Sequence, residues 1–185
     1  MTFAPLDTLL AELDVALADP QGGSRVAKLL ENYAFARHDD WRRFAFFEAT
    51  YYARNLIRRS DLYELIVLCW GQGQRSPIHD HAEQRCWMAV LDGTVRESLF
   101  QVSPDGRVVT PGAVRQFRQG GVAFIVDSIG WHRIEPDAGG AAVTLHLYSK
   151  PIRECRILDE DAGRVSTKRM RYHSIGGVVQ AAGVG

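Results

Sequence analysis

The stretch Gly73–His81 (GQRSPIHDH) contains the most closely spaced of the six histidines in this 185-residue chain. On a β-strand, alternate side chains share a face, so we expect His79 and His81 to point one way and Asp80 the other. Two imidazoles on one face of a strand can bind a divalent metal ion. A His-x-His pair is nevertheless more often exposed, or satisfied by hydrogen bonds, than a metal site. If this pair does bind a metal ion, further ligands have to come from elsewhere in the chain.

Short β-favouring segments surround this stretch from about residue 61 to about residue 165. The expected strands are Glu64–Trp70, Arg85–Leu91, Thr94–Val102, Gly121–Val126, Trp131–Glu135, Ala142–Tyr148 and Arg156–Leu158. Asp92-Gly93, between two of them, is a strong signal for a hairpin turn. Many short strands separated by turn signals favour a sandwich or a barrel, so we expect a mainly β protein.

The N-terminal part, to about residue 60, is predicted to be helical. One helical face of its first segment is apolar, with Leu6, Leu9, Leu10, Leu13 and Leu17. Asp19–Gly23 ends that helix, and Ser24 is a suitable N-cap for a second one. A third segment, around Trp41, is helical or irregular. No linker divides the chain, so we expect the helices to pack on the barrel in one domain covering residues 1–185.

Composition limits the possible partners and the location. Lys and Arg number 22, as do Asp and Glu, and zero net charge gives no general attraction to nucleic acid or to an acidic membrane. Residues 1–7 lack the basic segment of a signal peptide, and no apolar run reaches the roughly 18 residues of a membrane span. Three cysteines cannot all pair, and so few predict a cytoplasmic protein. We expect a monomer, because no long apolar helix face is left over.

The spacing around the two histidines resembles the first motif of the cupin superfamily. Gly73, His79, His81 and Gly93 occupy its fixed positions. Cys86 stands where most cupins have a glutamate that serves as a metal ligand. The resemblance therefore implies a metal site without that carboxylate.

A third histidine fits the second cupin motif, although that motif is degenerate here. Gly121 and His132 have its spacing, whereas Asp127, Ile129 and Pro136 replace its usual Pro, Gly and Asn. A single histidine in such a setting is more often a core or surface residue, so this motif alone is weak.

Several further segments are similar to the cysteine dioxygenase family and follow that family's order. They are Tyr52–Leu56 (YARNL), Cys69–Gly71 (CWG), Ile78–His81 (IHDH), Cys86, Thr144–Ser149 (TLHLYS), Cys155 and Tyr172–Ser174 (YHS). Thr144 replaces the family's serine and keeps its hydroxyl. The resemblance extends through nearly the whole chain. It implies a cupin-type jelly-roll β-barrel with N-terminal helices packed on it.

The same resemblance implies a metal and a reaction. His79, His81 and His132 would bind Fe(II) as neutral imidazoles, leaving about three open positions for a chelating substrate and O₂. The implied reaction adds both oxygen atoms of O₂ to the sulfur of L-cysteine and gives cysteine sulfinic acid. The substrate would chelate the iron through its thiolate and its amine.

Two residues would bind the substrate, and three would assist the chemistry. Arg54 matches the arginine that pairs with the substrate carboxylate, a geometry that suits a guanidinium, with Tyr52 beside it. Tyr148 would donate a hydrogen bond to bound O₂ or to the product, supported by His146. Cys86 matches a cysteine that can form a thioether with that tyrosine. Without the resemblance, these residues would be interpreted as a surface arginine, packing aromatics and a buried free cysteine.

Two alternative functions remain at this stage. One is a dioxygenase of 3-mercaptopropionate or another small thiol. Such relatives often lack the cysteine at position 86 and carry glutamine at position 54, so both residues favour L-cysteine. The other is a cupin that binds a metal or a small ligand without catalysis.

Overall fold

The computed structural model describes residues 4–103, 107, 109–137 and 139–181. Two α-helices and one 3₁₀ helix come first: α1 Pro5–Ala18, α2 Gly23–Phe35 and η1 Asp40–Phe44. The first strands are β1 Ala53–Arg59, β2 Glu64–Trp70, β3 Ile78–His79, β4 Cys86–Asp92, β5 Thr94–Val102, β6 Val109–Arg118 and β7 Val122–Ile125. They are followed by β8 Trp131–Pro136, β9 Ala142–Tyr148, β10 Glu154–Asp159, β11 Arg164–Arg169, β12 Ser174–Ile175 and β13 Val178–Val179.

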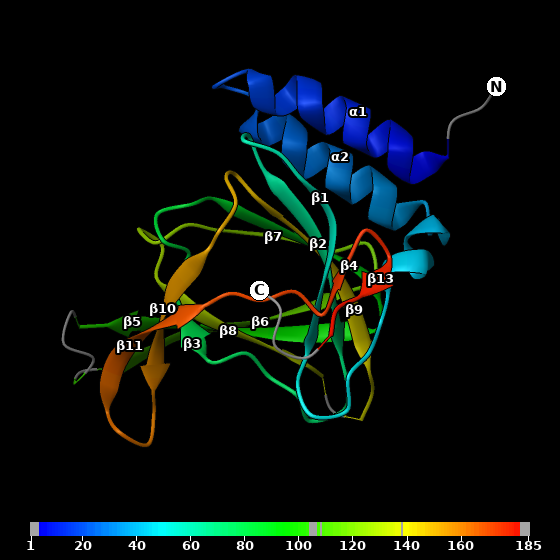
Figure 1. Cartoon of the computed structure of the whole chain (residues 1–185). Helices are drawn as coiled ribbons and strands as arrows, with labels where there is room; N and C mark the ends of the chain where they lie inside the picture. Colours follow the sequence, from blue (N-terminus) through cyan, green and yellow to red (C-terminus); the bar gives the residue numbers. More distant parts are fainter. Residues whose placement is uncertain (1–3, 104–106, 108, 138, 182–185) are drawn as a thin grey trace.

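The strands form two sheets that face each other across the barrel, as Figure 1 shows. The first has the order β13-β12-β1-β2-β9-β4-β7, and the second β11-β10-β3-β8-β5-β6. The helices α1 and α2 lie together on the outer face of the first sheet. The predicted mainly β barrel with N-terminal helices packed on it is therefore confirmed.

Strand β2 shows how the two faces of the first sheet are used. All seven of its residues are buried, as expected for a strand covered on both sides. Leu65, Val67 and Cys69 belong to the core shared with the helices. The alternate residues Ile66 and Leu68 belong to the separate core inside the barrel. The side chains at the even-numbered positions of β2 therefore point into the barrel.

The predicted boundary of the barrel is wrong at both ends. Ala53–Arg59, placed in the helical part, is strand β1, and it pairs antiparallel with β2 and parallel with β12. Its pattern was obscured because polar residues, Arg54 and Asn55, occupy buried positions. Strand pairing also continues beyond residue 165, through β11, β12 and β13.

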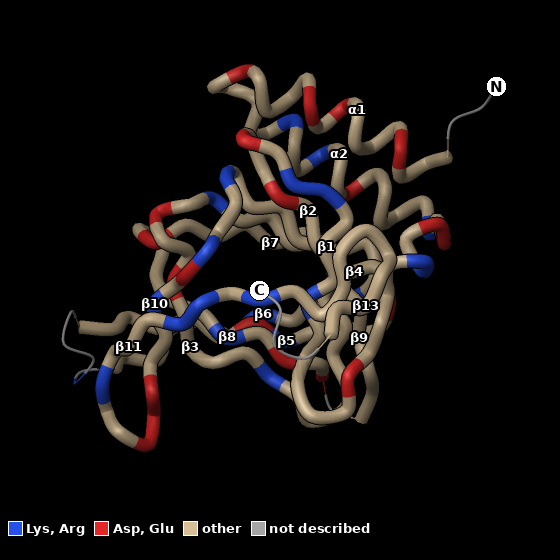
Figure 2. The backbone as a smooth tube through the Cα atoms, in the orientation of Figure 1, with Lys and Arg blue, Asp and Glu red and all other residues tan. Residues whose placement is uncertain are grey.

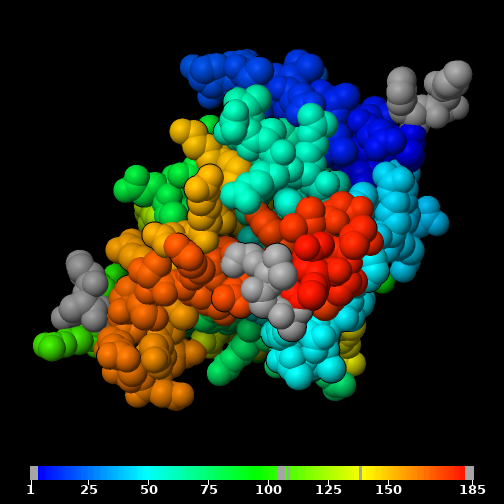
Figure 3. Space-filling view, viewed as in Figure 1, coloured from blue at the N-terminus to red at the C-terminus, as the bar shows by residue number. Residues whose placement is uncertain are grey.

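The C-terminal part of the described chain closes the edge of the first sheet next to β1. In Figure 3 its red residues lie against the cyan residues that follow α2. The backbone N–H of His173 donates to the carbonyl of Arg54 at 2.7 Å, and the Ser174 hydroxyl donates to Oδ1 of Asn55 at 2.8 Å. None of the helices in the described residues is long and apolar enough to cross a membrane.

Candidate functional site

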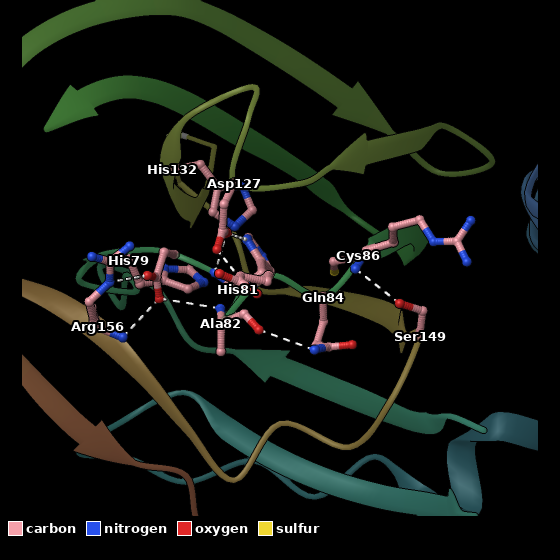
Figure 4. A network of polar contacts seen from close by, with 12 residues as sticks. His79, His81, Ala82, Gln84, Cys86, Asp127, His132, Ser149 and Arg156 are labelled. Carbon is pink, nitrogen blue, oxygen red and sulfur yellow. Dashed lines mark hydrogen bonds and ion pairs between the residues drawn. The ribbon is translucent and has the colours of Figure 1, made fainter. Parts of the chain in front are cut away.

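Three histidines converge inside the barrel, on the second sheet. His79 ends β3 and is paired in register with His132 of β8, and His81 follows two residues after His79. One ring nitrogen from each lies within 4.8 Å of the others, and the ring centroids are 4.7–5.2 Å apart. The expected alternation is confirmed, because Asp80 turns away to bind Arg156, with 2.5 Å between Oδ2 and Nε. Figure 4 shows this arrangement.

The surroundings of the three rings fit a metal ion. The Nδ1 atom of His132 lies 2.8 Å from Oε1 of Glu97, and that of His79 lies 3.0 Å from the carbonyl of Pro77. These contacts orient the two rings and leave Nε2 of each available to a metal. Both ring nitrogens of His81 are buried without a hydrogen bond, an arrangement that a bound cation would explain.

Burial also keeps these histidines in the form that binds metals. Desolvation lowers the pKa of His79, which the carbonyl of Pro77 partly offsets. Desolvation, together with the neighbouring imidazoles, holds the pKa values of His81 and His132 well below the usual range. Neutral imidazoles offer a free lone pair, so the cluster needs no deprotonation to bind a cation at neutral pH.

Sequence reasoning missed two carboxylates that support the cluster. Glu97 of β5 is fully buried and bridges His132 and Arg115, whose Nη2 lies 2.6 Å from its Oε2. Asp127 accepts hydrogen bonds at 2.7 Å from the backbone N–H groups of His81 and Glu83. In the sequence, the only signal for Glu97 is a charged residue within a predicted strand, and the only signal for Asp127 is its departure from the cupin motif.

Asp127 stabilises an unusual turn directly after His81. Ala82 and Glu83 adopt left-handed backbone conformations, with φ of 49° and 65°, which cost free energy for residues other than glycine. The carboxylate of Asp127 spans this turn (Figure 4). It thereby fixes the backbone from which His81 projects.

Four of the five other predicted site residues line the same cavity as the histidines: Tyr52, Arg54, His146 and Tyr148. Cys86, the fifth, is buried next to the cavity and lies opposite Tyr148 in the pairing of β4 with β9. Cys69, Cys86 and Cys155 are all free thiols. Burial raises the pKa of Cys86, so its sulfur is protonated at neutral pH.

Arg54 is buried, so the interpretation as a surface arginine is wrong. Its side chain is 8% exposed, whereas that of Arg58, further along β1, is 41% exposed and pairs with Asp14 at the surface. Burial opposes the charge of Arg54, but nearby Tyr148 and Glu64 favour it, and the net effect raises its pKa. Its Nε is buried without a hydrogen-bond partner.

Tyr52 packs against the barrel wall while also lining the cavity. Its ring stacks on Trp70 with 4.6 Å between centroids. The indole N–H of Trp70 donates to Oγ1 of Thr144 at 2.8 Å, and that oxygen lies 2.9 Å from Nε2 of His146. Thr144 and His146 are therefore joined by a hydrogen bond. His146 in turn contacts Tyr148 through its ring, with the two centroids 6.1 Å apart.

A wider cavity of about 400 Å³ adjoins the histidine cavity, and the two share Tyr52, Arg54 and Met170. Basic side chains gather along its wall: Lys168, Arg169 and Arg171. Figure 2 shows blue backbone along β11 and the segment that follows it, where these residues lie in the sequence. Clustered positive charge favours anionic ligands, so the approach to Arg54 suits a carboxylate.

The sequence of this chain is similar to those of known proteins. It matches the family described as cysteine dioxygenase type I over residues 1–161. It is 35% identical to cysteine dioxygenase type 1 of Rattus norvegicus over 181 residues, which cover 96% of this chain and 88% of that relative. It is 36% identical to the Danio rerio protein of the same name over 154 residues, covering 80% of this chain and 76% of that relative.

Among solved structures, an uncharacterized conserved protein with a double-stranded beta-helix domain from Klebsiella pneumoniae subsp. pneumoniae MGH 78578 has a similar fold. The TM-score is 0.50 at 13% identity, with 62% of this chain and 85% of that chain covered. This likeness supports the cupin-type barrel. The family match and the identities over most of the sequence go further, and they show that this chain belongs to the cysteine dioxygenase type I family.

Proposed function

We propose that this protein is an Fe(II)-dependent dioxygenase of L-cysteine that produces cysteine sulfinic acid. The observation that carries the proposal is the buried Arg54, which faces the same cavity as three metal-competent histidines. A cation site and a guanidinium in one enclosed space suit a small substrate with a metal-binding end and a carboxylate. When bound, the iron would supply the redox chemistry that joins both atoms of O₂ to the thiol sulfur.

Three histidines and no carboxylate would hold the iron. Cys86, at the position of the usual glutamate, is protonated and directed toward Tyr148. His79, His81 and His132 are neutral, so they would leave the charge of the cation undiminished. That charge would favour an anionic thiolate and thereby help the substrate to lose its thiol proton.

Arg54 would bind and orient the substrate. Its unpartnered Nε is a buried donor that a substrate carboxylate can satisfy. A guanidinium–carboxylate pair fixes direction as well as distance, so the thiol end would be aimed at the histidines. Tyr52, held by its stack on Trp70, would form the adjoining wall.

Tyr148 would act as the hydrogen-bond donor of the site. Burial raises its pKa well above the usual value, so the phenol keeps its proton at neutral pH. Its ring lies 6.1 Å from those of both His81 and His146. From this place the hydroxyl would donate to the oxygen atoms being transferred. His146, which is hydrogen-bonded to Thr144, would restrict the rotation of the Tyr148 side chain.

A substrate comparison tests this proposal. The Fe(II)-loaded protein should consume O₂ with L-cysteine at a higher kcat/KM than with 3-mercaptopropionate, and sulfinate should be the product. A much larger kcat/KM with 3-mercaptopropionate would assign the protein to the other thiol. No thiol-dependent O₂ uptake with either compound would indicate a cupin that binds metal without this catalysis.

The location and assembly are part of the proposal. Three free cysteines, all buried, suit the reducing cytoplasm. The apolar faces of α1 and β2 are used within the chain, which suits a monomer. Sedimentation of the purified protein should give a mass near that of one chain.

A further inference from the structure

The buried carboxylate of Glu64 lies behind Arg54. Glu64 is fully buried, at the first position of β2, and its Oε1 is 3.4 Å from Nη2 of Arg54. Its Oε2 accepts a hydrogen bond from the hydroxyl of Tyr172. The family motifs that carry the proposed function do not include this carboxylate.

The strand register explains why Glu64 reaches the site. It lies opposite Tyr148 in the pairing of β2 with β9, and Cys86 lies opposite Tyr148 on its other side. Three neighbouring strands therefore place Glu64, Tyr148 and Cys86 in one row facing the barrel interior. Arg54 lies over the end of this row, with its Cζ 5.8 Å from the centroid of the Tyr148 ring.

Tyr172 reaches Glu64 because the C-terminal segment is fastened to β1. The backbone N–H of His173 donates to the carbonyl of Arg54 at 2.7 Å. The ring of Tyr172 also lies against the guanidinium, 5.8 Å from its Cζ. Arg54 is thus held on one side by the ring of Tyr172 and by the carboxylate that Tyr172 orients.

We propose that Glu64 and Tyr172 are positioning residues that fix the guanidinium of Arg54 to receive the carboxylate of the thiol substrate. Glu64, which Tyr172 orients, engages Nη2 and leaves the unpartnered Nε free for the substrate. A fixed donor spends less conformational entropy when the substrate binds. Glu64 also compensates the buried positive charge while the site is empty. The proposal rests on the proposed function, in which Arg54 binds that carboxylate.

The test uses Tyr172→Phe and Glu64→Gln. Tyr172→Phe removes the hydrogen bond to Glu64 and keeps the ring, whereas Glu64→Gln keeps an acceptor for Arg54 and removes the charge. Steady-state kinetics with L-cysteine should show KM raised about tenfold in Tyr172→Phe and several-fold in Glu64→Gln, with kcat within about twofold of wild type. The dissociation constant of L-cysteine for the Fe(II)-loaded protein without O₂ should rise in parallel.

Two controls separate positioning from general damage. Tyr63→Phe breaks a tyrosine–carboxylate bond of the same kind, from Tyr63 to Asp14 at 3.0 Å, on the helix-facing side. It should lower thermal stability without changing KM. Cysteamine has the thiol and amine of L-cysteine without the carboxylate, and its dissociation constant should be the same for wild type and Tyr172→Phe.

The outcomes distinguish this inference from the proposed function. An unchanged KM in Tyr172→Phe, or an equal loss of cysteamine binding, overturns the positioning role. A lower KM in Glu64→Gln also overturns it, because Glu64 would then compete with the substrate for Arg54. Wild-type protein that binds L-cysteine but does not oxidise it overturns the proposed function, while the dissociation constants still test the positioning residues.

Discussion

Cys86 and Tyr148 lie directly opposite each other on β4 and β9, and both are buried. Neighbouring residues of paired strands have their side chains on the same face and within reach of each other. The pair therefore places a thiol beside a phenol ring next to the three-histidine cluster. The same thiol lies 3.8 Å from Nδ1 of His146.

We predict a Cys86–Tyr148 thioether after turnover with iron, L-cysteine and O₂. The sulfur would bond to a ring carbon, with loss of the thiol hydrogen and one ring hydrogen, while O₂ takes up the two electrons and two protons. Intact-mass measurement should show protein lighter by two hydrogens, and a joined peptide should appear after digestion. Cys86→Ser should abolish the change. Cys69→Ser removes a buried thiol that faces the helices, and this variant should still show the loss of two hydrogens. An unaltered mass in the wild type would contradict the prediction.

Glu97 should control metal affinity through His132. Its carboxylate accepts from Nδ1 of that histidine at 2.8 Å and is itself paired with Arg115. Such supporting carboxylates are worth about 10–100-fold in metal affinity. We expect Glu97→Gln to weaken iron binding to that extent in competition with a chelator. Glu135→Gln, which breaks the exposed ion pair with Arg96, is the matched control and should leave affinity unchanged.

The contacts of Glu97 and the strand β1 could not be predicted from local sequence patterns. The His-x-His alternation predicted the convergence of two rings, because a local period decides it. Glu97 lies beside His132 because β5 pairs with β8. This pairing sets Glu97 opposite Ile134, which is two residues after His132 on β8. That neighbourhood depends on strand order, which no local pattern specifies. Strand β1 does not show an apolar strand pattern, because its buried half carries the polar residues Arg54 and Asn55.

Arg54 should be needed for substrates that carry a carboxylate. Removing its guanidinium deletes a charged donor from a buried site, and a hydrogen bond to a charged group contributes about 1.5–3 kcal/mol. We therefore expect Arg54→Gln to lower kcat/KM for L-cysteine by at least tenfold, chiefly through KM. Arg58→Gln, at the exposed end of the same strand, removes an ion pair with Asp14 and should change kcat/KM by less than about twofold, since exposed pairs are weak. Equal losses in both variants would exclude a specific substrate contact.

The metal-free protein should lose stability as pH falls below about 6.5, the usual pKa of histidine in an unfolded chain. Desolvation lowers the pKa values of His79, His81, His132 and His146 in the folded state. Above pH 6.5 these histidines are neutral in both states and contribute no pH dependence. Below it the unfolded chain takes up protons that the folded chain does not, so the free energy of unfolding decreases.

Each histidine that stays neutral in the folded state should contribute up to about 1.4 kcal/mol per pH unit to that decrease. Urea unfolding of metal-free protein at several pH values between 7.5 and 5 measures the slope. His146→Gln removes one buried imidazole without removing a proposed metal ligand, so its slope should be shallower by one histidine's share. A slope that is the same in wild type and His146→Gln would mean that His146 is protonated in the folded protein. A protonated His146 has no free nitrogen lone pair, so it could not accept a hydrogen bond from Thr144. The proposed support of Tyr148 by a neutral His146 would then be wrong.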